Sequence, residues 1–123
     1  MRLVDTSAWI EFLIGTPTGA RLRPAMPEIE EWLVPTMVQL ELAKWLMRNR
    51  ADLLEPTIAL SRICVVAPMT MRIAVMAAEI CVKHKLATAD AVIYATAQEH
   101  GAELLTCDAH FRDLPGVILV KKT

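Results

Sequence analysis

Five short apolar segments, separated by stretches long enough for helices, constrain the fold of this chain more than any other feature. Most of them are continuously apolar, as in parallel strands covered by helices on both faces, without the alternation of a half-exposed antiparallel strand. We therefore expect an α/β fold, a three-layer α/β/α sandwich with a mainly parallel central sheet, as a single domain over residues 1–123. The expected strands are 2–4, 30–35, 63–66, 104–107 and 117–120.

The composition argues against several other classes of protein. Hydrophobic residues make up 54% of the 123 residues, so the chain can bury a sizeable core and is not typical of disorder. Glu79 interrupts the longest apolar run, 73–82, which falls short of the roughly 18 residues of a membrane helix. The first residues lack the apolar stretch of a signal peptide. The three cysteines are scattered without metal-binding spacing and predict reduced thiols in a cytoplasmic protein.

Signals for helix ends lie between the expected strands. Thr6 or Ser7 is expected to cap a helix, and Thr36 with Gln39 forms the pattern of a capping box, in which the two side chains satisfy exposed backbone amides. Gly101 is expected to end a buried, alanine-rich helix, because glycine adopts the left-handed conformation without strain. The expected helices are 8–13, 36–50, 53–62, 70–85 and 88–100, with a loop at 15–19 and irregular turns around the two prolines that follow.

Four acidic residues are expected to meet at one edge of the sheet. Asp5 and Asp108 each follow a strand directly, and Glu41 and Asp90 each lie in the first turns of a helix. Strand ends and helix starts share the edge at which α/β proteins bind ligands. Because ionised carboxylates repel one another, the arrangement favours a divalent cation, and oxygen ligands suit Mg²⁺ or Mn²⁺. Zinc is not expected, since no histidine or cysteine stands at ligand spacing with these acids.

A site of this kind can lower the pKa of a metal-bound water and hold a phosphate for in-line hydrolysis. Each acid also has a plainer interpretation. Asp5 and Asp90 could cap helices, and Asp108 could be a turn residue. Glu41 could belong to an exposed charged stripe on its helix. The convergence of all four favours the metal site. Three histidines, His84, His100 and His110, are interpreted as surface or structural residues.

Four parts of the sequence resemble one known family. They are DTSAWIEFL at 5–13, the helical Glu41, LATADAVIYATA at 86–97 and LLTCDAHF at 104–111. In this order and spacing they resemble the PIN-domain ribonucleases. The length and the DTSAWIEF opening resemble, more narrowly, the VapC toxins of toxin–antitoxin pairs. The resemblance extends over nearly the whole chain, 3–120.

The resemblance implies a PIN-like fold and a metal-dependent endoribonuclease that hydrolyses single-stranded or structured RNA, often tRNA or rRNA. It implies Mg²⁺ as cofactor, for which Mn²⁺ substitutes. The implied partners are a second copy in a homodimer and a VapB-type antitoxin whose C-terminal segment blocks the acidic site. The implied catalytic and metal-binding residues are Asp5, Glu41, Asp90 and Asp108, and the implied supporting hydroxyls are Ser7 or Thr6 and Thr106.

The residues that contact RNA or antitoxin are less clearly indicated. The net charge of −1 comes with no evident basic patch, and Arg48, Arg50 and Arg112 are only candidate phosphate contacts. Trp9 and Phe12 are expected in the core, although they could instead line a groove for the antitoxin.

Two other classes of function stay open. A phosphoacceptor receiver domain shares the length, the architecture and an acidic rim, but it needs an acceptor aspartate at the end of the central strand, and 64–68 offers none. It also needs a lysine near the end of the last strand, whereas Lys121 and Lys122 lie at the extreme C-terminus. A PIN-fold binding module without catalysis is the third class. The presence of all four carboxylates speaks against it.

Overall fold

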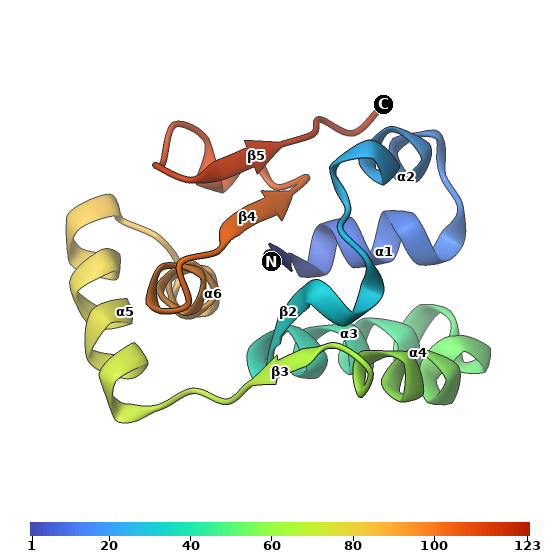
Figure 1. Cartoon of the computed structure of the whole chain (residues 1–123), viewed down its shortest axis with the longest axis horizontal. Coiled ribbons are helices and arrows are strands. Elements are labelled where there is room, and N and C mark those ends of the chain that lie inside the picture. Colours follow the sequence, from blue (N-terminus) through green and yellow to red (C-terminus); the bar gives the residue numbers. More distant parts are fainter.

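Five strands form one all-parallel sheet in the computed structural model, which describes residues 1–123. Their spatial order is β3-β2-β1-β4-β5, so β1 is central and β3 and β5 are the edges (Figure 1). The expected α/β fold with a parallel sheet is therefore confirmed. The strands are β1 Arg2–Val4, β2 Trp32–Pro35, β3 Val65–Ala67, β4 Glu103–Thr106 and β5 Val117–Leu119.

Six helices cover the sheet. Figure 1 shows α5 and α6 to the left of the strands and α1 and α2 to the right. No helix combines the length and the apolar character that crossing a bilayer demands. The helices are α1 Thr6–Ile14, α2 Pro17–Leu22, α3 Thr36–Asn49, α4 Leu54–Ser61, α5 Met71–His84 and α6 Thr88–Glu99, and short 3₁₀ turns lie at Arg23–Ala25, Ile29–Glu31, Ala51–Leu53 and Ala109–Phe111.

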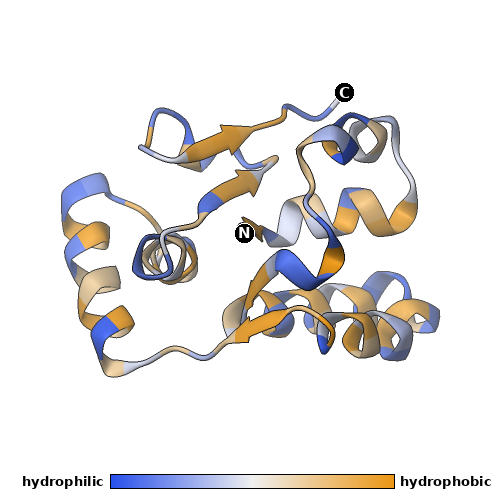
Figure 2. Ribbon diagram, viewed as in Figure 1, coloured by the Kyte–Doolittle hydropathy of each residue, from blue (hydrophilic) through white to orange (hydrophobic).

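Helix α6 lies inside the molecule and carries Asp90 at its start. Every residue from Ala91 to Ala97 is buried, as expected for a helix that is apolar or small on all sides. The Tyr94 hydroxyl donates to the Pro115 carbonyl at 2.6 Å, so its polar end has a partner. Figure 2 shows the strands largely in orange, whereas orange and blue alternate along the helices. Most of the buried apolar residues form one core cluster.

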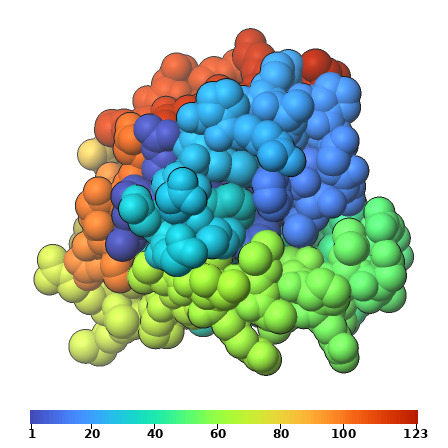
Figure 3. Space-filling model, turned by 45° about the vertical axis from the view of Figure 1, so that its right-hand side comes forward, coloured from blue at the N-terminus to red at the C-terminus, as the bar shows by residue number.

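The connection from α2 to β2 crosses the surface as two 3₁₀ turns, in agreement with the irregular turns expected there. Figure 3 shows this cyan segment between α2 in blue and the yellow-green chain near β3. Beneath it, the Trp32 ring packs edge-on against Trp9 at 4.7 Å between centroids and against Phe12 at 5.4 Å. Trp9 is fully buried, so it belongs to the core.

The expectation that Thr6 or Ser7 caps α1 is wrong, and the alternative interpretation of Asp5 as a helix cap is confirmed. Asp5 is the N-cap, and its carboxylate accepts a hydrogen bond from the Thr6 backbone N–H at 2.7 Å. The helix therefore begins directly after β1, and Thr6 and Ser7 lie in its first turn, with their hydroxyls free for other contacts. Gly101 follows α6 with φ of +62°, the left-handed conformation that the sequence predicts.

The capping box at the start of α3 is also wrong. Pro35 occupies the cap position, which has no side-chain hydrogen bond. Gln39 instead donates to the Ser61 hydroxyl at 3.0 Å and ties α3 to α4. The Gln39 side chain thus bonds a residue of another helix, and not the backbone at the start of its own helix that the spacing from Thr36 to Gln39 indicates.

Three expected boundaries differ from the structure. Residues Glu30 and Glu31 lie in a 3₁₀ turn, and β2 begins only at Trp32. Strand β3 begins at Val65, two residues later than expected, because the turns after α4 continue to residue 64. The expected loop at 15–19 is helical from Pro17, because Thr16 caps α2 by accepting from the Gly19 N–H at 3.0 Å.

The strand order also corrects the argument about a receiver domain. That argument took the segment 64–68 as the end of the central strand, but β3 is an edge strand. The central strand is β1, and it is followed by an aspartate, Asp5. The observed order nevertheless differs from the order 2-1-3-4-5 of the flavodoxin-like folds to which receiver domains belong.

Replacement of Gly19 by alanine is expected to lower the free energy of unfolding by about 1–3 kcal/mol. An added Cβ would lie 3.0 Å from the Glu11 carbonyl carbon and closer still to its oxygen, so α1 and α2 would have to separate. Urea unfolding measures the loss. The exposed neighbour Ala20→Ser, as a control, should change the free energy by less than about 0.5 kcal/mol. Equal stability of Gly19→Ala and the wild type would contradict the packing described for these helices.

Candidate metal centre

The strand order creates a binding edge between β1 and β4. From β1 the chain moves outward through β2 to β3 and then returns to the other side of β1 at β4. Open α/β sheets bind ligands where the order reverses in this way, beyond the carboxyl ends of the strands. Val4 and Leu105 are register partners, so the residues that follow them, Asp5 and Thr106, emerge at this edge together.

Asp5 is the buried carboxylate of the site, with 4% of its surface exposed. Its Oδ1 accepts from the Thr6 backbone N–H at 2.7 Å, and its Oδ2 accepts from the hydroxyls of Thr106 at 2.6 Å and Ser7 at 3.0 Å. Burial raises the pKa of Asp5 to about 6 in spite of these hydrogen bonds, and the charge of Glu41 adds to the rise. Asp5 therefore ionises at a higher pH than an ordinary aspartate, and a nearby positive charge would favour its ionised form.

Two hydroxyls join the ends of β1 and β4. Ser7 Oγ lies 3.2 Å from Thr106 Oγ1 and accepts from the Cys107 backbone N–H at 3.0 Å. Thr106 Oγ1 accepts from the Asp108 N–H at 2.9 Å and donates to Asp5. The network fixes the Asp5 carboxylate and the backbone that leads to Asp108, which is the geometry that a supporting role for Ser7 and Thr106 requires.

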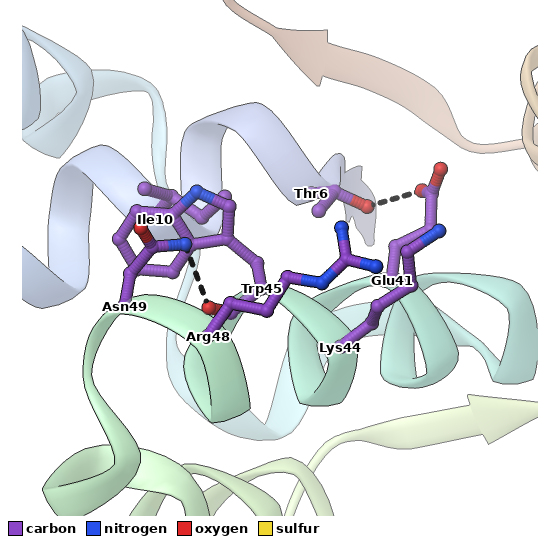
Figure 4. Close-up of a pocket in the computed structure, with 7 residues that line it drawn as sticks. All are labelled: Thr6, Ile10, Glu41, Lys44, Trp45, Arg48 and Asn49. Carbon is purple, nitrogen blue, oxygen red and sulfur yellow. Dashed lines mark hydrogen bonds between the residues drawn. The ribbon is translucent and has the colours of Figure 1, made fainter.

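Glu41 reaches the same edge from the second turn of α3. Thr6 Oγ1 donates to Glu41 Oε1 at 2.6 Å, while the Thr6 N–H donates to Asp5 (Figure 4). Thr6 therefore bridges the two carboxylates, one by its backbone and one by its side chain. Glu41 is partly buried and hydrogen-bonded across to α1, so an exposed surface stripe does not describe its environment.

Asp90 and Asp108 form the other half of the site. Asp90 is the third residue of α6 and makes no capping hydrogen bond, so the capping interpretation is wrong for it. Burial raises its pKa, with further rises from the charges of Asp108 and Glu41 that His110 partly opposes. Asp108 follows β4 and accepts from the His110 N–H at 2.9 Å, so it is a turn residue as well as a member of the acidic edge.

His110 belongs to this half, although the sequence interpretation placed it on the surface or in a structural role. Its Nδ1 lies 3.1 Å from Asp108 Oδ1 and 3.7 Å from Asp90 Oδ2. One ligand atom from each of the three residues lies within 4.8 Å of the other two. The sequence Asp108-Ala109-His110 could have indicated this contact. An aspartate in a turn often accepts a hydrogen bond from the backbone N–H two residues later, which brings that residue close.

The donor set fits a divalent cation. No lysine or arginine forms a salt bridge with any of the four carboxylates, and the exposed His110 is their one ionisable partner. Carboxylate oxygens suit Mg²⁺ and Mn²⁺, whereas an imidazole suits transition metals. The expectation that no histidine stands at ligand distance from the acids is therefore wrong. Zinc is thus not excluded on that ground where His110 lies beside Asp90 and Asp108.

Cationic side chains flank the acidic edge in two groups. The sequence showed no basic patch because the members of the second group come from separate segments. Arg50 belongs to neither group, because it pairs with Asp52 at 3.0 Å. The other two candidate phosphate contacts, Arg48 and Arg112, each belong to one group. The first group is Lys44 and Arg48, in a pocket beside Glu41, and the second is Arg112, Lys121 and Lys122, in a pocket beside Asp108.

Comparison with known proteins identifies one family. The family model of the PIN domain matches residues 2–117. A search of curated proteins gives no significant match.

Several solved structures share the fold over most of their length. A toxin–antitoxin complex from Klebsiella pneumoniae has a chain with a TM-score of 0.88 and 22% identity, and each chain is covered completely. A VapC toxin of Mycobacterium tuberculosis that cleaves the sarcin–ricin loop has a TM-score of 0.76 and 24% identity, with 95% of this chain and 97% of that chain covered. FitAcB from Neisseria gonorrhoeae has a TM-score of 0.72 and 20% identity, with 89% of each chain covered.

The raised pKa of Asp5 predicts how stability depends on pH without metal. Between about pH 4 and pH 6 the folded protein holds a proton that the unfolded chain has lost, so the free energy of unfolding falls as the pH rises through this window. Asp5→Asn removes this dependence and is expected to stabilise the protein at pH 7 by up to about 3 kcal/mol, with no gain below pH 4.

Urea unfolding in EDTA at both pH values measures this difference. Glu79→Gln, which neutralises an exposed carboxylate on α5, is the matched control and should alter stability by less than about 0.5 kcal/mol. The same pH dependence in the wild type and in Asp5→Asn would show that another group causes it.

Proposed function

This chain belongs to the PIN-domain family, and we propose that it is a metal-dependent endoribonuclease, the toxin of a VapBC-type toxin–antitoxin module. One observation carries the proposal: Asp5, Glu41, Asp90 and Asp108 lie at the reversal point of the sheet with no lysine or arginine bound to them. The proposal treats residues 1–123 as one nuclease domain.

The proposed chemistry is hydrolysis of an RNA phosphodiester. A divalent cation, Mg²⁺ or Mn²⁺, supplies a bound water of lowered pKa and positions the phosphate. The four carboxylates are the proposed ligands, to which His110 adds an imidazole beside Asp108. Thr6 holds Glu41, while Ser7 and Thr106 hold Asp5, so each of these two ligands is oriented by a hydroxyl before the cation binds.

The proposed macromolecular partners are an RNA, such as tRNA or rRNA, and a VapB-type antitoxin that covers the acidic edge. Support for the antitoxin comes from the similar folds, one of which belongs to a toxin–antitoxin complex and another to a DNA-bound VapBC. Support for RNA comes from the similar toxin that cleaves the sarcin–ricin loop and from the cations that flank the site. The proposed location is the cytoplasm, where such an RNA is found.

A homodimer is part of the same proposal. Apolar side chains are exposed at the β3 edge and along one side of α5, among them Val66, Met71 and Val75, of which Met71 is 84% exposed. A second copy of the chain would cover these side chains in the proposed homodimer. Sedimentation of the purified protein measures the mass, for which the proposal requires twice that of the 13.7 kDa chain.

Purified protein is expected to cut RNA into discrete fragments with Mg²⁺ or Mn²⁺ and not with EDTA. Asp90→Asn and Glu41→Gln should each lower the rate by about 100-fold or more, because the cation supplies several kcal/mol of transition-state stabilisation. Thr106→Val removes the hydroxyl that donates to Asp5 and accepts from the Asp108 N–H, and it should cost roughly 10- to 100-fold. Gel analysis of total RNA measures these effects, and Glu79→Gln should cut as the wild type does.

Two outcomes would contradict the nuclease proposal. Cleavage that survives EDTA or Asp90→Asn would come from another site or another protein. Binding of Mn²⁺ without cleavage of any RNA would favour a PIN-fold binding module. Thermal unfolding with and without Mn²⁺ separates these cases from misfolding, because a cation that binds only the folded state raises the melting temperature.

A further inference from the structure

A pocket of about 290 Å³ opens beside Glu41 between α1 and α3. This volume lies just below the range for small-molecule sites, roughly 300–1,000 Å³, and suits a ligand group about the size of one nucleotide. Figure 4 shows Glu41 with Thr6 at one end of the pocket and the Trp45 indole beside Ile10 at the other. The lining residues are Thr6, Ile10, Glu41, Lys44, Trp45, Arg48 and Asn49.

The pocket presents two cations that no residue of the chain neutralises. Lys44 and Arg48 are exposed and form no salt bridge, in contrast to Arg50, which is paired with Asp52. Figure 4 shows the Arg48 side chain directed toward the hydrogen bond between Thr6 and Glu41. The two cations therefore line the pocket beside the acidic edge, where they favour an anionic ligand.

Trp45 is the one tryptophan that solvent reaches. Trp9 and Trp32 are 0% and 3% exposed, whereas Trp45 is only partly buried. No hydrogen bond within the chain uses its indole N–H, and Asn49 contacts only its backbone carbonyl, at 2.9 Å. A partly exposed indole with a free donor next to unpaired cations has the groups with which proteins hold an unpaired base and its phosphate.

We propose that this pocket binds one unpaired nucleotide of a single-stranded RNA, immediately next to the phosphodiester at the acidic edge. The base stacks on Trp45, and Lys44 and Arg48 contact the adjoining phosphates. The inference rests on the proposed nuclease function and adds a substrate requirement to it: the RNA must be unpaired at this position, since a base inside a duplex cannot reach the indole. Trp45 is thus a specificity-determining residue for the proposed reaction.

Tryptophan fluorescence tests the pocket independently of cleavage. The probe is a 2′-O-methyl RNA of about ten nucleotides, of oligo-A or oligo-U sequence, in EDTA so that no metal-dependent cleavage occurs. Binding should quench the wild-type emission and leave the emission of Trp45→Phe unchanged, because the two remaining tryptophans are buried. Fluorescence anisotropy of the same RNA carrying a fluorescein label measures affinity for every variant.

We expect Trp45→Ala to weaken binding by roughly 5- to 150-fold, the range for the loss of one stacked base, and Trp45→Phe to weaken it less. Removal of either cation, in Lys44→Gln or Arg48→Gln, should make the negative slope of log K against log salt shallower by about 0.7. Lys83→Gln, on the exposed last turn of α5, is the matched control and should leave affinity and slope unchanged.

The outcomes separate the pocket from the nuclease proposal. Binding of the RNA without quenching, or equal affinity of Trp45→Ala and the wild type, overturns the pocket while RNA binding stands. Tighter binding of a blunt RNA duplex than of the single strand also overturns it. Quenching by an antitoxin peptide but by neither RNA assigns the pocket to the protein partner and overturns the nucleotide proposal. Failure of the wild type to cleave any RNA, with quenching intact, contradicts only the proposed nuclease.

Discussion

The rest of the site depends on the hydrogen bonds of the buried Asp5 carboxylate. This carboxylate accepts hydrogen bonds from Thr6, Ser7 and Thr106, and these bonds join the end of the central strand to the start of α1 and to the end of β4. Backbone hydrogen bonds already hold the two strand ends together, as from the Asp5 N–H to the Leu105 carbonyl at 2.9 Å, and the side-chain bonds fix the carboxylate relative to them. The same burial that makes the network precise raises the pKa of Asp5 and opposes its ionisation.

The unfavourable ionisation of Asp5 connects the fold to the proposed function. Burial chiefly raises the pKa values of Asp5 and Asp90, and the charges of neighbouring carboxylates add to the rise: Glu41 acts on Asp5, and Asp108 and Glu41 act on Asp90. A bound cation would remove the repulsion and stabilise the ionised form, so the metal-free protein is less stable than its packing permits. The surrounding cations do not neutralise the acids directly. They lie in flanking pockets, where a phosphate backbone that crosses the edge would meet them.

The sequence predicted those features that depend on local pattern. The apolar segments predicted a parallel sheet, and Gly101 predicted the end of α6, because burial and the left-handed conformation leave direct marks on residue type. Features that depend on tertiary contacts were not predicted. Gln39 donates to Ser61 and does not cap its own helix, and His110 contacts Asp108 through a turn. The second group of cations comes from separate segments of the chain. The positions of the four acids followed from topology alone, whereas their hydrogen bonds required the folded chain.

The central claim is that four carboxylates from separate segments bind a cation together. The most direct test is the anomalous scattering of Mn²⁺ in crystals of the protein soaked with the metal. The account predicts density bounded by Asp5, Glu41, Asp90 and Asp108, with Mn²⁺–oxygen distances of about 2.0–2.2 Å, near those of Mg²⁺. Density at His110 and Asp108 alone, or no density at saturating Mn²⁺, would contradict it. The acidic edge would then be a structural network of caps and turns.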